Sequence, residues 1–423
     1  MRALCSSRPR SGLTAAHRRR PIRCPASLEA SPVAAAPLVD RAEELSSSPP
    51  LHVVTPLVYS DPLSRAAGLP VFLKLEGSQP CGSFKLRGIG AACQAAAARG
   101  ATALVSSSGG NAGLAVAHSA RALRLPATVV LPTTSLPSVR ARLQAYGATV
   151  VLFGSCWAEA HRHAESLPGA LIHPFLPFKG TDTWTGHASL VTECAEQLPV
   201  AAAAAGASPA LSRLAAGGPP GALVCSVGGG GLLMGCLLGA ASVGWDATHV
   251  IAVETAGAAC LAAALAAGRV VTLPELTSVA SSLGAPAVCD AAFAAASQQP
   301  MSFNPSAPIQ RGAGAFSSGL PRVVSSVVSD AEAVAACVSF LDDHRSLVEP
   351  ACGAALAEAY LWKERAAARA ASLPSSSPPS SSSHAPSSPT NPPDSLLVVV
   401  CGGACVDAAG LQALAATLGV QRL

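Results

Sequence analysis

"CSVGGGGLLMG", at residues 225–235, places four consecutive glycines between the end of one apolar run and the start of another. An apolar strand, a glycine loop and a helix in this order form the basic unit of parallel α/β sheets. The order recurs at "SSSGGNAG", residues 106–113, and "LLVVVCGGACVD", residues 396–407, again ends an apolar run in glycines. Ligands of such sheets bind at the carboxyl ends of the strands, so these three loops form the candidate site.

Short apolar runs alternate with amphipathic stretches on both sides of these loops. Helices are expected at 112–123 and 138–147, the second of which ends at Gly147 as a capped helix does. The strands are continuous apolar runs, which is typical of parallel strands buried on both faces. A chain of 423 residues suits two domains. We therefore expect an α/β protein with two doubly wound domains, and strands at 71–76, 101–106, 127–132, 148–154, 170–175, 222–227, 249–254 and 395–403.

Three segments rich in Ser, Pro, Gly and Ala interrupt this pattern, at 199–221, 297–319 and 372–395. Such a composition buries too little apolar surface to offset chain entropy, so we expect disordered surface insertions. Residues 214–245 carry no charge, but "GGPPG" and "GGGG" interrupt them. Each glycine inside a helix costs about 1 kcal/mol, which argues against a membrane-spanning segment.

The N-terminal segment carries seven arginines before the first acidic residue, Glu29. This composition, without an apolar core, is typical of an organelle transit peptide, and "PIRCPA" at 21–26 favours a plastid over a mitochondrion. The alternative is a plain disordered tail on a cytoplasmic protein. Without residues 1–28 the chain has 21 basic and 24 acidic residues. Because no basic stripe remains, nucleic-acid binding is not expected.

The two glycine loops favour different anions. The loop at 106–113 leads into a predicted helix, whose free N–H groups could bind a carboxylate, although a simple strand-to-helix turn would look the same. The loop at 225–235 lets a phosphate approach the backbone closely. Its register fails GxGxxG, because Leu233 or Met234 stands at the third glycine position, and no lysine follows as in a P-loop. A single phosphate monoester therefore fits better than a pyrophosphate.

Two reactive side chains complete the candidate set. Lys85 lies in "GSQPCGSFKLRG", residues 77–88, beside the apolar Phe84, and Cys401 ends the strand before the third loop. Considered alone, Lys85 would be an ordinary surface lysine, and Cys401 would be an inert buried thiol.

Together these segments closely resemble the fold-type-II pyridoxal-phosphate enzymes, and among them the catabolic L-serine dehydratase/L-threonine deaminase family. The resemblance runs from about Leu51 to Gly419 through "LHVVTPL", "SQPCGSFKLRGIG", "SSSGGNAG", "PATVVLP", "VGGGGLL", "TLPELTSVA", "VEPACGAALA" and "VVVCGG". It implies a tryptophan synthase β-like fold with the cofactor in a cleft between the domains. The implied parts are a leader at 1–50, a large domain at 51–76 and 188–423, and a small domain at 77–187.

The resemblance also implies the role of each site residue. Lys85 would hold pyridoxal 5'-phosphate and, once released by the substrate amine, take the proton from the substrate Cα. A lysine acting as a base near neutral pH needs a lowered pKa, which an apolar site supplies. The other implied contacts are Phe84, Asn111 on the ring hydroxyl, Cys401 at the pyridine nitrogen, Gly228, Gly229, Gly230, Gly231 and Leu232 at the phosphate, and Ser108, Gly109, Asn111 and Ala112 around the substrate carboxylate.

A thiol at the ring nitrogen favours β-elimination, because it cannot keep that nitrogen protonated as an acid would. The implied reaction converts L-serine to pyruvate and ammonia, and L-threonine to 2-oxobutanoate and ammonia. Gly109 stands where related serine racemases carry an acid–base serine, so racemisation should be slow. A serine racemase or a cysteine-synthase-like β-replacement enzyme is the alternative within the family. A non-enzymatic nucleotide-binding α/β protein is the alternative outside it.

Further expectations come from the resemblance alone. A potassium ion would bind near the phosphate loop, although the thiol of Cys260 is a poor ligand for it and Glu254 could instead cap a helix. Glu349 in "VEPACG" is expected to be structural. The family forms homodimers, and since only 22 residues follow Cys401, no regulatory domain or isoleucine feedback is expected. The implied cation site is Gly228, Glu254, Ala258, Cys260, Leu283 and Ala285.

Overall fold

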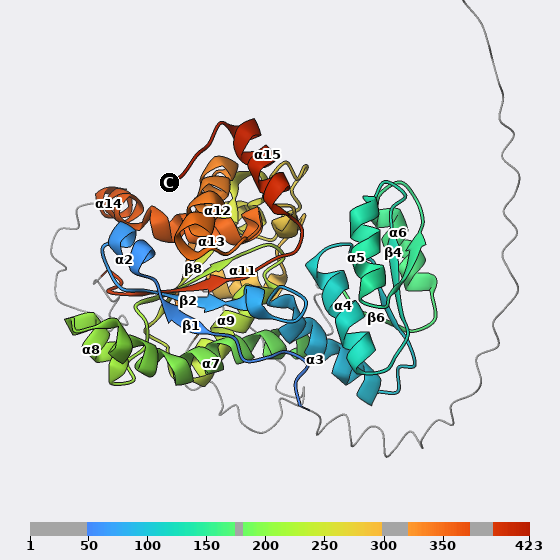
Figure 1. The fold of residues 1–423 in the computed structure, drawn as a ribbon, viewed down its shortest axis with the longest axis horizontal. Coiled ribbons are helices and arrows are strands. Elements are labelled where there is room, and N and C mark those ends of the chain that lie inside the picture. The colour runs from blue at the N-terminus through green and yellow to red at the C-terminus, as the bar shows by residue number, and fades with distance from the viewer. Residues whose placement is uncertain (1–48, 174–180, 298–319, 373–391) are drawn as a thin grey trace, which may run out of the picture.

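The computed structural model describes residues 49–173, 181–297, 320–372 and 392–423, and their strands form two separate sheets (Figure 1). The larger sheet has the order β1-β2-β10-β7-β8-β9, and the smaller has the order β5-β4-β3-β6. All pairings are parallel except that of β1 with β2. The larger sheet consists of β1 (Leu57–Tyr59), β2 (Val71–Leu75), β7 (Ala222–Ser226), β8 (His249–Thr255), β9 (Val323–Val328) and β10 (Leu396–Val400). The smaller consists of β3 (Leu104–Ser106), β4 (Ala127–Leu131), β5 (Thr149–Leu152) and β6 (Ala170–Leu171).

Helices cover both faces of the larger sheet, and a smaller group packs on the other sheet (Figure 1). One face carries α2 (Asp61–Ala67), α12 (Asp330–His344), α13 (Pro350–Tyr360), α14 (Trp362–Ser372) and α15 (Ala408–Leu418), and the other α7 (Thr181–Ala205), α8 (Pro209–Ala215) and α9 (Gly231–Ser242). The smaller sheet carries α4 (Asn111–Ala122), α5 (Pro137–Ala145) and α6 (Trp157–Ser166), and α3 (Lys85–Ala98) packs between α4 and α7. The remaining helices are α10 (Cys260–Ala267), α11 (Asp290–Ser297) and the 3₁₀ turns η1 (Glu76–Ser78), η2 (Ala256–Ala258) and η3 (Ser281–Leu283).

The two central strands of the larger sheet, β7 and β10, lie in the hydrophobic core. Every residue of β7 and β10 is buried, as parallel strands covered on both faces must be. In register, Val398 of β10 lies between Leu73 of β2 and Val224 of β7. The expectation of an α/β protein with parallel sheets is confirmed. Among the described residues, no helix is long and apolar enough to cross a membrane.

The expectation of disorder at 199–221 is wrong. Helix α7 continues through Pro199 to Ala205, and α8 follows at once. Ser208 caps α8 by accepting a hydrogen bond from the Leu211 N–H at 3.2 Å, and Leu211 is buried. Ala-rich sequence favours helix, and Ser-Pro here is a helix start rather than a sign of disorder.

The other two low-complexity segments fall mostly outside the described residues, at 298–319 and 373–391. The end of the third is ordered, because Asp394 pairs with Arg213 of α8 at 2.7 Å and Ser395 is buried. The N-terminal leader, apart from residues 49 and 50, also lies outside the described part of the chain.

Candidate active site

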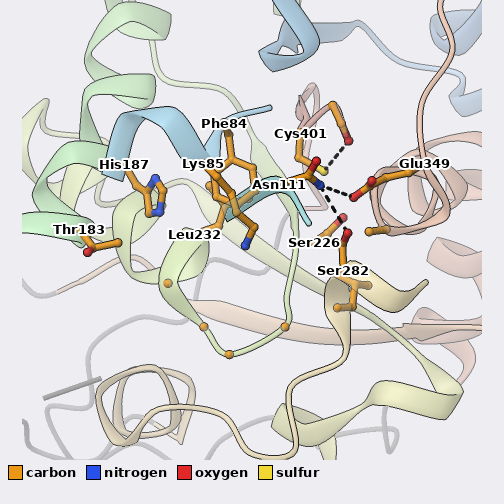
Figure 2. Close-up of a pocket in the computed structure, with 17 residues that line it drawn as sticks. Phe84, Lys85, Asn111, Thr183, His187, Ser226, Leu232, Ser282, Glu349 and Cys401 are labelled. Carbon is orange, nitrogen blue, oxygen red and sulfur yellow. Dashed lines mark hydrogen bonds between the residues drawn. The ribbon is translucent and has the colours of Figure 1, made fainter. Parts of the chain in front are cut away.

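A pocket lies at the carboxyl ends of β7 and β10, against the first turns of α3 and α4 (Figure 2). It brings together side chains and loops that are far apart in the sequence. Of the residues named from the sequence, it gathers Phe84, Lys85, Asn111, Gly228, Gly229, Gly230, Gly231, Leu232, Leu283 and Cys401. It adds Thr183, His187, Ser226, Ser282, Glu349, Ala351 and Gly402.

Lys85 is the first residue of α3 and points into this pocket (Figure 2). Its Nζ lies 5.2 Å from the centre of the Phe84 ring. Burial lowers the pKa of the Lys85 amine, and the negative charge of Glu349 opposes part of that shift. Because a neutral amine is both a nucleophile and a base, this lysine is suited to carbonyl chemistry.

The glycine loop joins β7 to α9 and forms one wall of the pocket. Gly230 has a φ of +92°, in the left-handed region that favours glycine, and a Cβ there would lie 2.6 Å from Ala292. At Gly231, the first residue of α9, a Cβ would meet no atom within 4 Å. Space for a ligand is therefore open directly at the N-terminus of a helix, which favours an anion.

Asn111 begins α4, and hydrogen bonds to three residues that are distant in the sequence hold its side chain. Its Nδ2 donates to Glu349 Oε1 at 2.9 Å and to Ser282 at 3.4 Å, and its Oδ1 accepts from the Ala404 N–H at 2.9 Å. These bonds fix the orientation of the amide at the pocket wall (Figure 2). Asn111 thus connects the two sheets through its side chain.

Cys401 directly follows β10 and lines the same pocket. A hydrogen bond with Cys352 and burial raise the pKa of the Cys401 thiol well above its usual value. This group is therefore a neutral thiol across the physiological pH range, in contrast to a carboxylate at such a position.

A lysine with a lowered pKa, a glycine loop at a helix N-terminus and a neutral thiol in one pocket suit an aldehyde cofactor with one phosphate. The family model "Pyridoxal-phosphate dependent enzyme" matches residues 49–373. The chain belongs to this family. Human "Serine dehydratase-like" is 47% identical over 320 residues, which cover 75% of this chain and 84% of that protein. Human "L-serine dehydratase/L-threonine deaminase" is 42% identical over 320 residues, covering 75% and 85%. The crystal structure of an L-serine ammonia-lyase from Rhizomucor miehei aligns with a TM-score of 0.66 and 30% identity, over 87% of this chain and 99% of that one.

The pocket residues fit pyridoxal phosphate. Two residues that line the pocket each carry a buried polar atom, His187 Nδ1 and Ser226 Oγ, with no hydrogen-bond partner in the described part of the chain. Buried polar atoms of this kind are normally satisfied, and a cofactor with several oxygen and nitrogen atoms would satisfy them. Together with the open space at Gly231, these atoms define a site that accepts the family's cofactor.

The predicted substrate loop of this pyridoxal-phosphate enzyme is not part of the pocket lining. Ser108, Gly109 and Ala112 precede or follow Asn111, but none of them lines the pocket. An added Cβ at Gly109 would lie 3.1 Å from Val139 and 3.2 Å from Leu131. The position thus faces apolar side chains next to the smaller sheet, and carboxylate binding by this loop stays a prediction.

Glu349, expected from the sequence to be structural, also lines the pocket. It is 3% exposed and precedes α13. Its Oε1 accepts from Asn111 and its Oε2 accepts from the Cys405 N–H at 3.2 Å. The sequence did contain a signal for this placement: in "VEPACG", an acidic residue stands directly before the proline that begins a helix. His187, Thr183 and Ser282 carried no such signal, and Ser226 lies in "CSVGGGGLLMG" but was not singled out there.

Several of the residues proposed for a potassium ion make hydrogen bonds within the chain. Gly228 O accepts from the Cys260 thiol at 3.3 Å, and Leu283 O accepts from the Ala285 N–H at 2.7 Å. Glu254 caps α10 by accepting from Leu261 N at 2.7 Å and Ala262 N at 2.8 Å, and burial raises its pKa. The buried Ala258 ends η2 close by in the sequence. Among the described residues, no three His, Cys, Asp or Glu side chains cluster as metal ligands.

Proposed function

We propose that this protein is an L-serine ammonia-lyase that also accepts L-threonine. The observation that carries the proposal is the pairing, in one pocket, of the Lys85 amine of lowered pKa with the neutral thiol of Cys401. The names of the curated relatives at 42–47% identity support it. The products would be pyruvate and ammonia from serine, and 2-oxobutanoate and ammonia from threonine.

Four parts of the pocket would have a role in this reaction: Lys85, Asn111, the glycine loop and Cys401. Bound pyridoxal phosphate supplies an electron sink for the bonds at the substrate Cα. Lys85 would hold the cofactor through its aldehyde, and the Lys85 amine would take the proton of the substrate Cα onto Nζ. Asn111, fixed by Glu349 and Ala404, would position the ring, and the glycine loop would bind the phosphate. Cys401 leaves the ring nitrogen without an acidic partner, which favours loss of the β-hydroxyl over other outcomes.

The purified protein should carry pyridoxal phosphate and release pyruvate from L-serine, and Lys85→Ala should abolish both. Lys363→Ala is the matched control, because Lys363 is exposed on α14. Pyruvate, 2-oxobutanoate, D-serine and cysteine are measured side by side. D-serine or cysteine as the main product would reject the proposal in favour of racemisation or β-replacement.

Three further properties belong to the proposal. We expect a homodimer, measured by light scattering, and stimulation of activity by potassium over sodium. We also expect the N-terminal segment to direct a fused fluorescent protein to a plastid, or otherwise a mitochondrion. Diffuse cytoplasmic fluorescence would contradict the last expectation.

A further inference from the structure

Helix α7 brings a histidine to the cofactor pocket. His187 is 5% exposed and lines the pocket together with Thr183, one helical turn earlier. Figure 2 shows these two side chains on the side of Leu232, while Asn111, Glu349 and Ser282 lie beyond Lys85 on the other side. His187 thus lines the pocket beside Leu232, the residue that follows the four glycines, and Asn111 lines it on the opposite side of Lys85.

Three neighbours fix the position of the His187 ring. A Cβ at Gly88 of α3 would lie 2.5 Å from His187 Cε1 and 2.6 Å from Nε2, and a Cβ at Gly235 of α9 would collide with His187 Cβ. The Phe84 ring packs on the third side, with 5.0 Å between ring centres. Because glycines on both helices make room for this side chain, the imidazole is held between the lysine helix and the helix that follows the glycine loop.

The ring retains hydrogen-bonding capacity that the described chain does not use. His187 Nδ1 is buried and has no partner among the described residues. Burial lowers the pKa of His187 to about 3, and the positive charges of Lys85, Arg87 and His52 add to this shift. The imidazole is therefore neutral in the absence of an anion and carries one N–H donor and one acceptor nitrogen.

We propose that His187 is a side-chain ligand of the cofactor's phosphate group and supplements the backbone N–H groups of Gly228–Gly231. A phosphate dianion accepts a hydrogen bond from the imidazole N–H, and its charge opposes the effect of Lys85 on the ring. The ring hydroxyl and ring nitrogen of the cofactor would lie at the opposite end, near Asn111 and Cys401. The inference depends on the cofactor of the family and is independent of the choice of substrate.

Pyridoxal, which lacks the phosphate, separates a phosphate contact from a general packing effect. Affinities of the apoprotein for pyridoxal phosphate and for pyridoxal are measured by equilibrium dialysis. For His187→Phe, which fills the space without a polar atom, we expect about 10- to 100-fold weaker binding of pyridoxal phosphate and unchanged binding of pyridoxal. His187→Asn, which can restore an N–H donor, should recover part of the loss and serves as the second variant if His187→Phe does not fold.

His118→Phe is the matched control, because His118 Nδ1 also lacks a partner among the described residues but the residue does not line the pocket. It should change neither affinity. The ³¹P resonance of the bound cofactor should move in His187→Phe and not in His118→Phe. Equal loss of both ligands, no loss of either, or an unmoved ³¹P resonance would overturn the inference. A protein that binds pyridoxal phosphate in this way but forms no pyruvate would contradict the proposed function and leave this inference intact.

Discussion

Replacing Arg87 by methionine is expected to lower the free energy of unfolding by about 3–5 kcal/mol, because a buried charge cluster would lose its central cation. Arg87 is fully buried on α3 and forms two bidentate ion pairs. It donates to Glu76 at 2.7 and 2.8 Å and to Glu193 at 2.7 Å twice. Lys74 completes the cluster, with its Nζ 2.6 Å from Glu193.

The structure indicates where the cost arises. In the wild-type protein, the charges of Arg87 and Lys74 balance those of Glu76 and Glu193. In the variant, the buried cluster carries one net negative charge. Glu193 still has Lys74, but among the described residues Glu76 keeps only neutral donors, the Thr55 hydroxyl at 2.6 Å and the Gln79 amide at 3.3 Å. A buried carboxylate with neutral partners alone is costly, so most of the loss is assigned to Glu76.

Urea unfolding followed by circular dichroism measures the loss, and a double-mutant cycle tests its origin. Adding Glu76→Gln to Arg87→Met removes the stranded charge, so the double variant should be more stable than the sum of the single losses, by between about 0.5 and 3 kcal/mol. Arg99→Met removes an exposed pair with Asp182 near the end of the same helix and should cost less than about 1 kcal/mol. Additive losses in the cycle, or equal losses for Arg87 and Arg99, would refute the reasoning.

The remaining predictions concern the pocket. Gly231→Ala should leave the fold intact, because its Cβ meets open space, but weaken pyridoxal phosphate binding about 10- to 150-fold by disturbing one hydrogen bond to a charged group, as measured by dialysis. Glu349→Gln removes the charge that raises the pKa of Lys85, so the pH midpoint for the reaction of the apoprotein with pyridoxal phosphate should move to lower pH; an unchanged midpoint would contradict this. Cys401→Asp should reduce pyruvate formation, since an acid there can keep the ring nitrogen protonated, and full activity would argue against the role of the thiol.

The sequence predicted the site residues that lie in a short strand–loop–helix motif, because such a motif determines where they lie in a parallel sheet. Lys85, the glycines at 228–231 and Cys401 each stand at a strand end or a loop that leads into a helix, so a parallel sheet brings them to one edge. His187 and Glu349 reach the same pocket from helices on other sides. Their approach depends on how helices pack on the sheets, which no short motif specifies.

The errors in the fold have similar causes. At 199–221 the composition of Ala, Ser and Pro indicated disorder, although Ser208 and Pro209 start a helix whose leucines are buried. Strand β9 was not predicted, because "VVSSVV" directly follows a low-complexity segment and its two serines interrupt an otherwise apolar run. Composition alone does not distinguish a surface insertion from a helix that covers a sheet.

Helix α3, which begins with Lys85, contacts both the core around the smaller sheet and helix α7. Its apolar face, with Leu86, Ile89 and Cys93, packs in the core around the smaller sheet. On another side of α3, Gly88 lies against the backbone of α7, and Arg87 donates a hydrogen bond to Glu193, which is also in α7. Lys85 begins this helix, so its position depends on both sets of contacts. Asn111 is similarly placed, because it starts a helix on the smaller sheet while its partner Glu349 precedes α13 on the larger one. A substitution at the contact of α3 with α7, such as Gly88→Ala, should therefore alter the affinity for pyridoxal phosphate, measured by equilibrium dialysis, although Gly88 itself does not line the pocket.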